Sequence, residues 1–286
     1  MKNYNDIYIE TRRALRAAGV EAGELEARLL LAAAADKSPA EFLRDIRMYP
    51  GPGFEERAAI NLERRLRGEP AAYITGSWSF MGLELEINPN VLIPRSDTEL
   101  LAQAGIDFLR EREEARVLDL CTGSGCIGLA IAAALPHARV LLTDVDGRAL
   151  LLAKRNALHC GLSQRCMCLE ADVMKAPARQ LGTFDLITCN PPYIPSAEVL
   201  TLDRSVRDYE PHSALDGGED GLDFYRSLFA RWTGILKPGG CLALECGEGQ
   251  SEELRRMAAE TGLLHRETLV DTLGTERTLL FTRSEA

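Results

Sequence analysis

The chain has 286 residues, of which 46% are hydrophobic and 27% charged, which suits a globular protein with one sizeable domain and a small one. Its 33 basic and 43 acidic residues give a formal net charge of −10, which disfavours general attraction to a phosphate backbone, so no direct nucleic-acid binding is expected. No apolar run approaches a membrane span, and residues 1–13 lack the features of a secretory signal or transit peptide, which predicts a cytoplasmic protein without membrane contact.

Residues 4–68 predict a small helical bundle, because apolar side chains recur at helical spacing in a segment rich in Ala, Leu, Glu and Arg. Ser38-Pro39-Ala40-Glu41 offers an N-cap, a proline at the first helical position and a capping-box glutamate. Residues 49–53 break the pattern with two prolines and two glycines, and a helix resumes from Phe54 to Arg67. Nothing in this segment carries a catalytic pattern, so we expect it to pack or to recognise a partner.

From residue 73 the sequence changes to short runs of alternating apolar and polar residues, which predict strands. These runs are Tyr73–Thr75, Trp78–Phe80 and Leu83–Ile87, the last two separated by a Met81-Gly82 turn. A hairpin linking two domains fits this pattern. We therefore divide the chain into a helical domain (residues 1–72), a hairpin linker (73–94) and a larger domain (95–286).

The larger domain begins with Ser96–Glu99, which offers capping residues to a helix that ends near Arg110. Alternating strands and helices follow, the pattern of an α/β fold with a mostly parallel sheet. The strands are predicted at residues 116–120, 140–144, 167–169, 184–189 and 241–245, with a terminal hairpin at 264–270 and 278–282. The helices are predicted at 126–135, 147–158, 224–236 and 250–261, and Lys237–Gly240 is predicted to be a turn.

The first strand of this series runs into a glycine-rich turn, Cys121–Gly125, with Asp119 at its head. Asp144 ends the next strand, about 20 residues beyond the turn, where an acidic side chain binds a ribose diol. A dinucleotide site would place a pyrophosphate beside Asp119, which would repel it. A carboxylate there can instead face a positively charged amino group, so the pattern favours S-adenosylmethionine over NAD.

The fourth strand leads into Asn190-Pro191-Pro192-Tyr193, or NPPY. Loops at the carboxyl ends of parallel strands are where open α/β sheets bind ligands. The two prolines stiffen this loop and remove two N–H donors, while Asn190 supplies an amide and Tyr193 an aromatic face. A rigid set of acceptors beside an aromatic plane suits a planar NH2 group. The irregular stretch 205–221 is predicted to be a mobile insertion that covers the substrate.

Eight cysteines form no Cys-x-x-Cys pair and have no histidine at zinc spacing, so we predict no metal site. Most of them lie in or beside apolar runs, where a free thiol behaves as a small hydrophobic group. Reduced, buried thiols fit a reducing compartment.

Taken together, Asp119–Gly125, Asp144 and NPPY resemble the class I S-adenosylmethionine-dependent methyltransferases that act on amino groups. Glu69–Gly76 and Val91–Glu99 are more specific, and resemble the HemK/PrmC family of protein-glutamine N5-methyltransferases that act on peptide chain release factors. The resemblance covers nearly the whole chain. It implies a Rossmann-like, seven-stranded, mostly parallel sheet with an antiparallel last strand, preceded by the helical bundle and the hairpin linker.

The resemblance also implies roles for individual residues, and a monomer that modulates translation termination by methylating the Gly-Gly-Gln glutamine of release factors. The S-adenosylmethionine site would comprise Asp119, Cys121, Thr122, Gly123, Ser124, Gly125, Asp144, Val173 and Asn190. The substrate amide would be held by Asn190, Pro191, Pro192 and Tyr193. Val173, near the adenine, stands where some family members have an aromatic residue.

We hypothesise that the Asn190 side-chain oxygen and the Pro191 carbonyl accept hydrogen bonds from the substrate NH2, while Tyr193 packs on the amide plane. Catalysis would then be positioning and electrostatic stabilisation without a dedicated base. One alternative is a nucleic-acid adenine methyltransferase that uses NPPY to hold a flipped base, which the net charge of −10 disfavours. Another is a non-catalytic S-adenosylmethionine-binding protein, which the intact NPPY disfavours.

Overall fold

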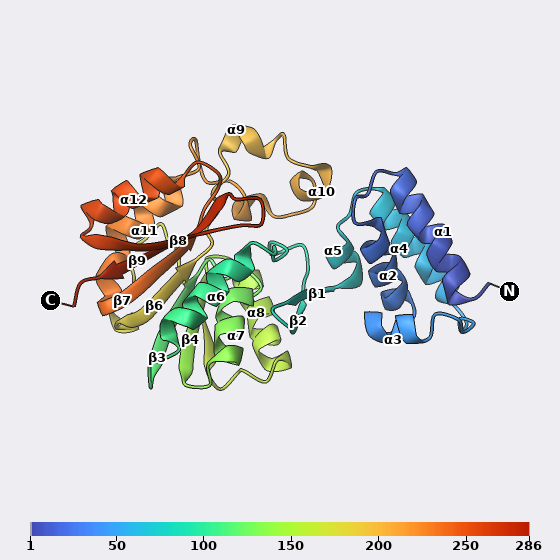
Figure 1. Ribbon diagram of the computed structural model, residues 1–286, viewed down its shortest axis with the longest axis horizontal. Helices are drawn as coiled ribbons and strands as arrows, with labels where there is room; N and C mark the ends of the chain where they lie inside the picture. Colours follow the sequence, from blue (N-terminus) through green and yellow to red (C-terminus); the bar gives the residue numbers. More distant parts are fainter. Residues whose placement is uncertain (1, 286) are drawn as a thin grey trace. The chain divides into compact units, whose positions relative to one another are not determined.

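The computed structural model describes residues 2–285 and divides into two compact units (Figure 1). The helical unit comprises the residues up to Ser77 together with Asp203–Tyr209. The sheet unit comprises Trp78–Leu202 and the residues from Glu210 onward. The loop that follows NPPY therefore contributes a segment to the helical unit before it returns to the sheet unit.

The helical unit is built on aromatic packing. The helices are α1 (Tyr4–Ala17), α2 (Gly23–Ala34), α3 (Pro39–Arg44), α4 (Phe54–Leu66), α5 (Ala71–Thr75) and the short α10 (Arg204–Arg207). The Tyr4 ring meets the rings of Phe42 and Phe54 edge-on, at centroid distances of 5.3 and 4.9 Å. The Ser38–Glu41 capping box forms as predicted. The Tyr209 hydroxyl donates to the Arg67 carbonyl at 3.2 Å, which fastens the returning loop to the end of α4.

The strand predicted at Tyr73–Thr75 is wrong, because these residues form the last part of the short helix α5. Pro70 precedes the first turn and Gly76 ends it in the left-handed conformation, with φ of 74°. Ile74 packs into the helical core beside Leu15 and Leu30. Burial of this apolar turn outweighs the strand preference of an aromatic and two β-branched residues.

The predicted hairpin is present as β1 (Ser77–Phe80) and β2 (Leu83–Glu86). Met81 and Gly82 both have positive φ, 47° and 79°, as a two-residue hairpin turn requires. Asn156, fully buried on helix α8 (Gly147–His159), accepts a hydrogen bond from the Glu86 amide at 2.7 Å and donates to the Glu86 carbonyl at 3.0 Å. The second strand of the hairpin is thereby tied to the sheet unit.

The sheet unit is organised around a seven-stranded sheet of order β5-β4-β3-β6-β7-β9-β8, in which β9 is antiparallel to both of its neighbours (Figure 1). The strands are β3 (Ala115–Leu120), β4 (Ala138–Asp144), β5 (Cys166–Glu170), β6 (Phe184–Cys189), β7 (Leu236–Glu245), β8 (Leu263–Val270) and β9 (Glu276–Arg283). This confirms the predicted class I methyltransferase fold. The chain moves outward from β3 to β5 and then returns to β6 on the other side of β3, so the strand order reverses between β3 and β6. Ligands of open α/β sheets bind at such reversals.

Helices cover both faces of this sheet (Figure 1). One face carries α6 (Thr98–Leu109), α7 (Cys126–Ala134) and α8 (Gly147–His159), and the other carries α11 (Asp223–Arg231) and α12 (Ser251–Glu260). The predicted turn at Lys237–Gly240 lies within β7 as a bulge, because the partner register jumps from Leu236 to Cys241. Short α9 (Ser196–Val199) and the 3-10 turn His212–Ala214 lie in the loop after NPPY.

Gly128 allows α7 to approach the sheet closely. A Cβ at this position would lie 2.3 Å from Leu142 and 2.9 Å from Val140, both on β4. We therefore predict that Gly128→Ala lowers the free energy of unfolding by about 1–3 kcal/mol, measured by urea denaturation. Gly234→Ala is the matched control, because its Cβ would meet no atom within 4 Å, and it should change stability by less than about 0.5 kcal/mol. Equal stability of the two variants would contradict this packing.

Candidate active site

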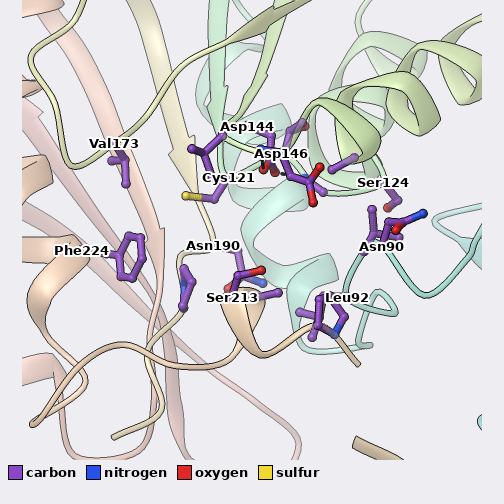
Figure 2. A pocket seen from close by; sticks show the side chains of 18 of the residues that line it. Asn90, Leu92, Cys121, Ser124, Asp144, Asp146, Val173, Asn190, Ser213 and Phe224 are labelled. Carbon is purple, nitrogen blue, oxygen red and sulfur yellow. Dashed lines mark hydrogen bonds between the residues drawn. The ribbon is translucent and has the colours of Figure 1, made fainter. Parts of the chain in front are cut away.

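A cavity of about 480 Å³ lies at the carboxyl ends of β3, β4 and β6, within the sheet unit (Figure 2). This volume is typical of small-molecule sites. Among the predicted site residues, those that line the cavity are Cys121, Thr122, Gly123, Ser124, Asp144, Val173, Asn190 and Pro192. The predicted residues that do not line it are Asp119, Gly125, Pro191 and Tyr193. The structure therefore brings eight of the twelve predicted site residues to one cavity and places the other four outside its wall.

The glycine-rich turn is held in a conformation that few residues adopt. Cys121, Gly123 and Gly125 have positive φ of 55°, 54° and 86°. Glycine takes this conformation at little cost, whereas Cys121 is strained. The Thr122 amide donates to the Thr143 carbonyl at 2.9 Å, and this bond anchors the turn to β4. The turn thus folds back over the strand ends and contributes one wall of the cavity.

Asp144 is fixed at the end of β4 by two backbone amides. The Gly123 amide donates to Oδ2 at 2.9 Å and the Asp146 amide to Oδ1 at 3.0 Å. Each carboxylate oxygen keeps a second lone pair, so a pair of hydroxyl groups can bind the two oxygens. Burial raises the pKa of Asp144, and the two amide hydrogen bonds oppose that shift. Figure 2 shows the side chain at the cavity wall beside Cys121 and Asp146.

Asp119 lies behind the turn and not in the cavity, where it is fully buried. Its Oδ2 accepts from the Thr122 hydroxyl at 2.5 Å and from the Gly128 amide at 3.2 Å, and its Oδ1 accepts from the Thr188 hydroxyl at 2.7 Å. The expected direct contact with a ligand amino group does not fit this placement, because the carboxylate is turned toward its own loop, helix and neighbouring strand. Asp119 is a support of the site.

Val173 and Phe224 face the cavity from the same side (Figure 2). The Val173 carbonyl accepts from the Ser227 hydroxyl at 2.8 Å and from the Trp232 indole at 3.0 Å, which fixes the backbone at this point. Phe224, at the start of α11, supplies an aromatic face that the sequence analysis did not assign. The cavity wall therefore carries an aromatic ring from α11, although position 173 is a valine.

Two residues of the NPPY segment line the cavity, and the other two lie outside its wall. Asn190 and Pro192 line the cavity, and Asn190 Nδ2 donates to the Thr98 hydroxyl at 3.3 Å. Because the amide nitrogen is occupied, Oδ1 is the atom left to accept from a ligand. Tyr193 instead donates its hydroxyl to Glu245 Oε1 at 3.2 Å, and burial raises its pKa well above the ordinary value.

The loop after NPPY contributes a further wall. Pro211, His212 and Ser213 line the cavity, as part of the predicted covering insertion. Buried Glu210 holds this stretch in place, because it accepts from the Ile93 amide at 3.0 Å and pairs with the Arg95 guanidinium. The mobility of this loop stays a prediction.

Sequence reasoning missed other wall residues, most of which come from distant segments, while Asp146 and Asp172 lie close in sequence to the predicted Asp144 and Val173. The missed residues include Asn90, Leu92, Pro94, Thr98, Asp146, Asp172 and Phe224. Thr98 lies in the Val91–Glu99 stretch that resembles the HemK/PrmC family, but its local pattern indicates a helix cap and no role in a site. Within residues 2–285, no group of His, Cys, Asp and Glu side chains is arranged to hold a metal ion, and the eight cysteines are free thiols. No helix in the part of the chain that the structure describes is long and apolar enough to span a membrane.

The chain matches two family models. The PrmC N-terminal domain matches residues 6–76, and the methyltransferase small domain matches residues 97–203. A release factor glutamine methyltransferase from Moorella thermoacetica is 41% identical over 277 residues, which cover 96% of this chain and 97% of that protein. The chain belongs to the release factor glutamine methyltransferase family.

Further similarities agree with this assignment. The release factor glutamine methyltransferase of Geobacter sulfurreducens is 40% identical over 93% of this chain and 92% of its own length. A solved methyltransferase from Pyrococcus furiosus is 21% identical, with a TM-score of 0.52 over 79% of this chain and 99% of that one. That likeness shows the fold alone. The resemblance to the HemK/PrmC family seen in the sequence is confirmed, and class I methyltransferase domains use S-adenosylmethionine generally.

The buried Asp119 generates a testable pH dependence. Burial raises its pKa from 3.8 to about 6, although the Thr122 and Thr188 hydroxyls and the Gly128 amide lower it. Because the folded protein then binds this proton more tightly than the unfolded chain, Asp119 favours folding more as the pH falls through this range. Relative to Asp119→Asn, we predict that wild type gains roughly 2–3 kcal/mol of unfolding free energy between pH 7 and pH 4. Urea unfolding at several pH values measures this difference, and a difference that does not vary with pH would contradict the assignment.

Proposed function

We propose that this protein transfers a methyl group from S-adenosylmethionine to the side-chain nitrogen of the glutamine in the Gly-Gly-Gln motif of peptide chain release factors, and thereby modulates translation termination. The observation that carries the proposal is that one cavity holds both a diol-binding carboxylate, Asp144, and an amide acceptor, Asn190. Family membership supports glutamine as the substrate, because the relatives bear that activity in their names.

The residues present fit S-adenosylmethionine. Asp144 offers two oriented carboxylate oxygens for the ribose hydroxyls, and the turn Cys121–Ser124 offers a backbone wall for the methionine part. Val173 and Phe224 offer an apolar and an aromatic face for the adenine. Asp119 would act from behind the turn, as a support and as a negative charge near the amino group. When bound, the cofactor supplies an electrophilic methyl group on a sulfonium.

The chain's own contribution to the reaction is orientation. An amide nitrogen is a weak nucleophile because its lone pair is delocalised into the carbonyl. The Asn190 Oδ1 would accept one substrate N–H and the Pro191 carbonyl the other, which fixes the nitrogen and favours positive charge as it develops there. The nitrogen becomes acidic as it is methylated, so its proton can leave to solvent. No general base is needed.

We propose that the helical unit recognises the protein substrate, because it holds no catalytic cluster and matches the PrmC N-terminal domain. The net charge of −10 makes an extended nucleic-acid partner a poor fit. We expect the protein to act as a monomer in the cytoplasm.

The proposal is tested by offering radiolabelled S-adenosylmethionine with two substrates side by side, a purified release factor and adenine-containing DNA. We expect label on the release factor alone. A release factor with its Gly-Gly-Gln glutamine changed to alanine is the matched control and should take up no label. Label on DNA alone would overturn the proposal and would mean that Asn190 holds a base.

Substitutions at Asn190 and at Asp144 should affect different steps, the first methyl transfer and the second cofactor binding. Asn190→Ala should lower the rate of methyl transfer roughly 100- to 1000-fold, because it removes a preorganised acceptor, while its affinity for S-adenosylmethionine stays within a few-fold of wild type. Asp144→Asn should weaken cofactor binding roughly 10- to 100-fold, because an oxygen that accepts from the ribose becomes a nitrogen. Calorimetry measures the affinities. Full turnover in a folded Asn190→Ala protein that binds cofactor would refute the role of Asn190.

A further inference from the structure

Glu245 is a buried carboxyl behind the cavity that the mechanism above does not use. It ends β7, its exposed fraction is 2%, and its carbonyl accepts from the buried Tyr225 hydroxyl at 2.7 Å. Oε1 accepts from the Tyr193 hydroxyl, whereas Oε2 has no partner within hydrogen-bonding geometry among the residues that the structure describes. A carboxyl buried with so few partners is costly. Its position directly behind the NPPY segment suggests what it does.

Thr98 lies between this carboxyl and the cavity. It is the first residue of α6, its exposed fraction is 2%, and its Oγ1 accepts from Asn190 Nδ2. The hydroxyl also acts on Glu245, since burial raises the pKa of Glu245 while Thr98 and Tyr193 lower it. A hydroxyl that accepts from Asn190 still has its own proton to donate, and neighbouring Glu245 has an oxygen, Oε2, that accepts from no residue the structure describes. With that proton directed at Glu245, the donors would run in one direction, from Asn190 through Thr98 to Glu245.

This direction matters because the two ends of an amide are almost the same size. Oxygen and nitrogen of Asn190 can exchange places by rotation of the side chain, and packing alone discriminates poorly between them. Only the oxygen can accept from a substrate NH2. The nitrogen in that place would present a donor to a donor and would hold the substrate away.

We propose that Thr98 and Glu245 are positioning residues that lock the Asn190 amide with its oxygen toward the substrate nitrogen. This inference rests on the proposed function and deepens it, because it assigns the selectivity for an NH2 group to a chain of three side chains. A glutamate in place of the substrate glutamine would direct its carboxylate at the Asn190 oxygen. Two acceptor oxygens repel each other, so this side chain would not bind. Tyr193 acts in the same arrangement by holding Glu245 from the other side.

The test is a double-mutant cycle on methyl transfer to a purified release factor. Thr98→Val removes the hydroxyl and should lower kcat roughly 10- to 100-fold, with the affinity for S-adenosylmethionine unchanged. Thr98→Ser restores the hydroxyl and should return kcat to within a few-fold of wild type. In an Asn190→Ala background, Thr98→Val should cost nothing further, because the side chain that it positions is absent. A full independent loss in that background would overturn the proposal.

Thr278→Val is the matched control. Thr278 pairs with Glu245 in the β7–β9 register, is fully buried, and its hydroxyl has no partner among residues 2–285. The substitution makes the same chemical change beside the same carboxyl, and should leave kcat within about 2-fold of wild type. A loss equal to that of Thr98→Val would mean that both changes act through general packing, and would overturn the assignment.

A second measurement separates this inference from the proposed function. The 15N–1H side-chain resonances of Asn190, identified by their absence in Asn190→Ala, report the bond to Thr98 without any methyl acceptor. We expect them to shift in Thr98→Val and in Glu245→Gln, whose amide donates to Thr98 and reverses the chain, and to stay in place in Thr278→Val. Unmoved resonances in Thr98→Val would overturn the inference even if the release factor is methylated. If the wild type leaves the release factor unlabelled but the variants show these shifts, the proposed function is contradicted and the inference about Asn190 stands.

Discussion

The buried carboxylate of Asp119 is the interaction on which the site depends. It sits on β3, at the reversal of strand order, and binds a hydroxyl from its own turn, a hydroxyl from β6 and an amide of α7. The Thr143 hydroxyl donates to the Asp119 carbonyl at 3.0 Å and joins β4 to the same point. An ionised carboxyl in this place lowers stability at neutral pH, but its hydrogen bonds join β3, β6 and α7, while the Asp119 backbone carbonyl joins β4. Because these elements are joined, Asp144 at the end of β4 and Asn190 after β6 border one cavity.

The cavity is formed by the ends of these strands together with residues from α11 and from the long loop after NPPY. Carboxylate and backbone groups at the strand ends suit a polar cofactor, while Phe224 and the stretch after Glu210 enclose it from α11 and from the long loop. The same loop fastens to the helical unit through Tyr209. One segment therefore belongs in part to the helical unit and in part to the cavity wall.

Much of this could be predicted from sequence, and the exceptions share a cause. The strands, the hairpin, Asp144 and the position of Asn190 follow from local periodicity and from motif spacing. Tyr73–Thr75 was predicted wrongly because its helix depends on burial against Leu15 and Leu30, far away in the sequence. Phe224 and Glu245 carry no local signal, since they reach the site only when separate segments meet, and the pattern around Thr98 indicates a helix cap and not its contact with Asn190. Asp119 was recognised as a carboxylate of the site, but only tertiary structure shows that it faces inward, to Thr122 and Thr188.

The most direct test of the central claim is to locate the methyl group on the product. Tandem mass spectrometry of a release factor incubated with this protein and with S-adenosylmethionine carrying a deuterated methyl group would read the modified atom. The account predicts a single deuterated methyl on the side-chain nitrogen of the Gly-Gly-Gln glutamine, absent when Asn190→Ala replaces the wild type. A methyl on an oxygen, on a backbone nitrogen or on another residue would contradict the claim that this cavity orients a side-chain amide.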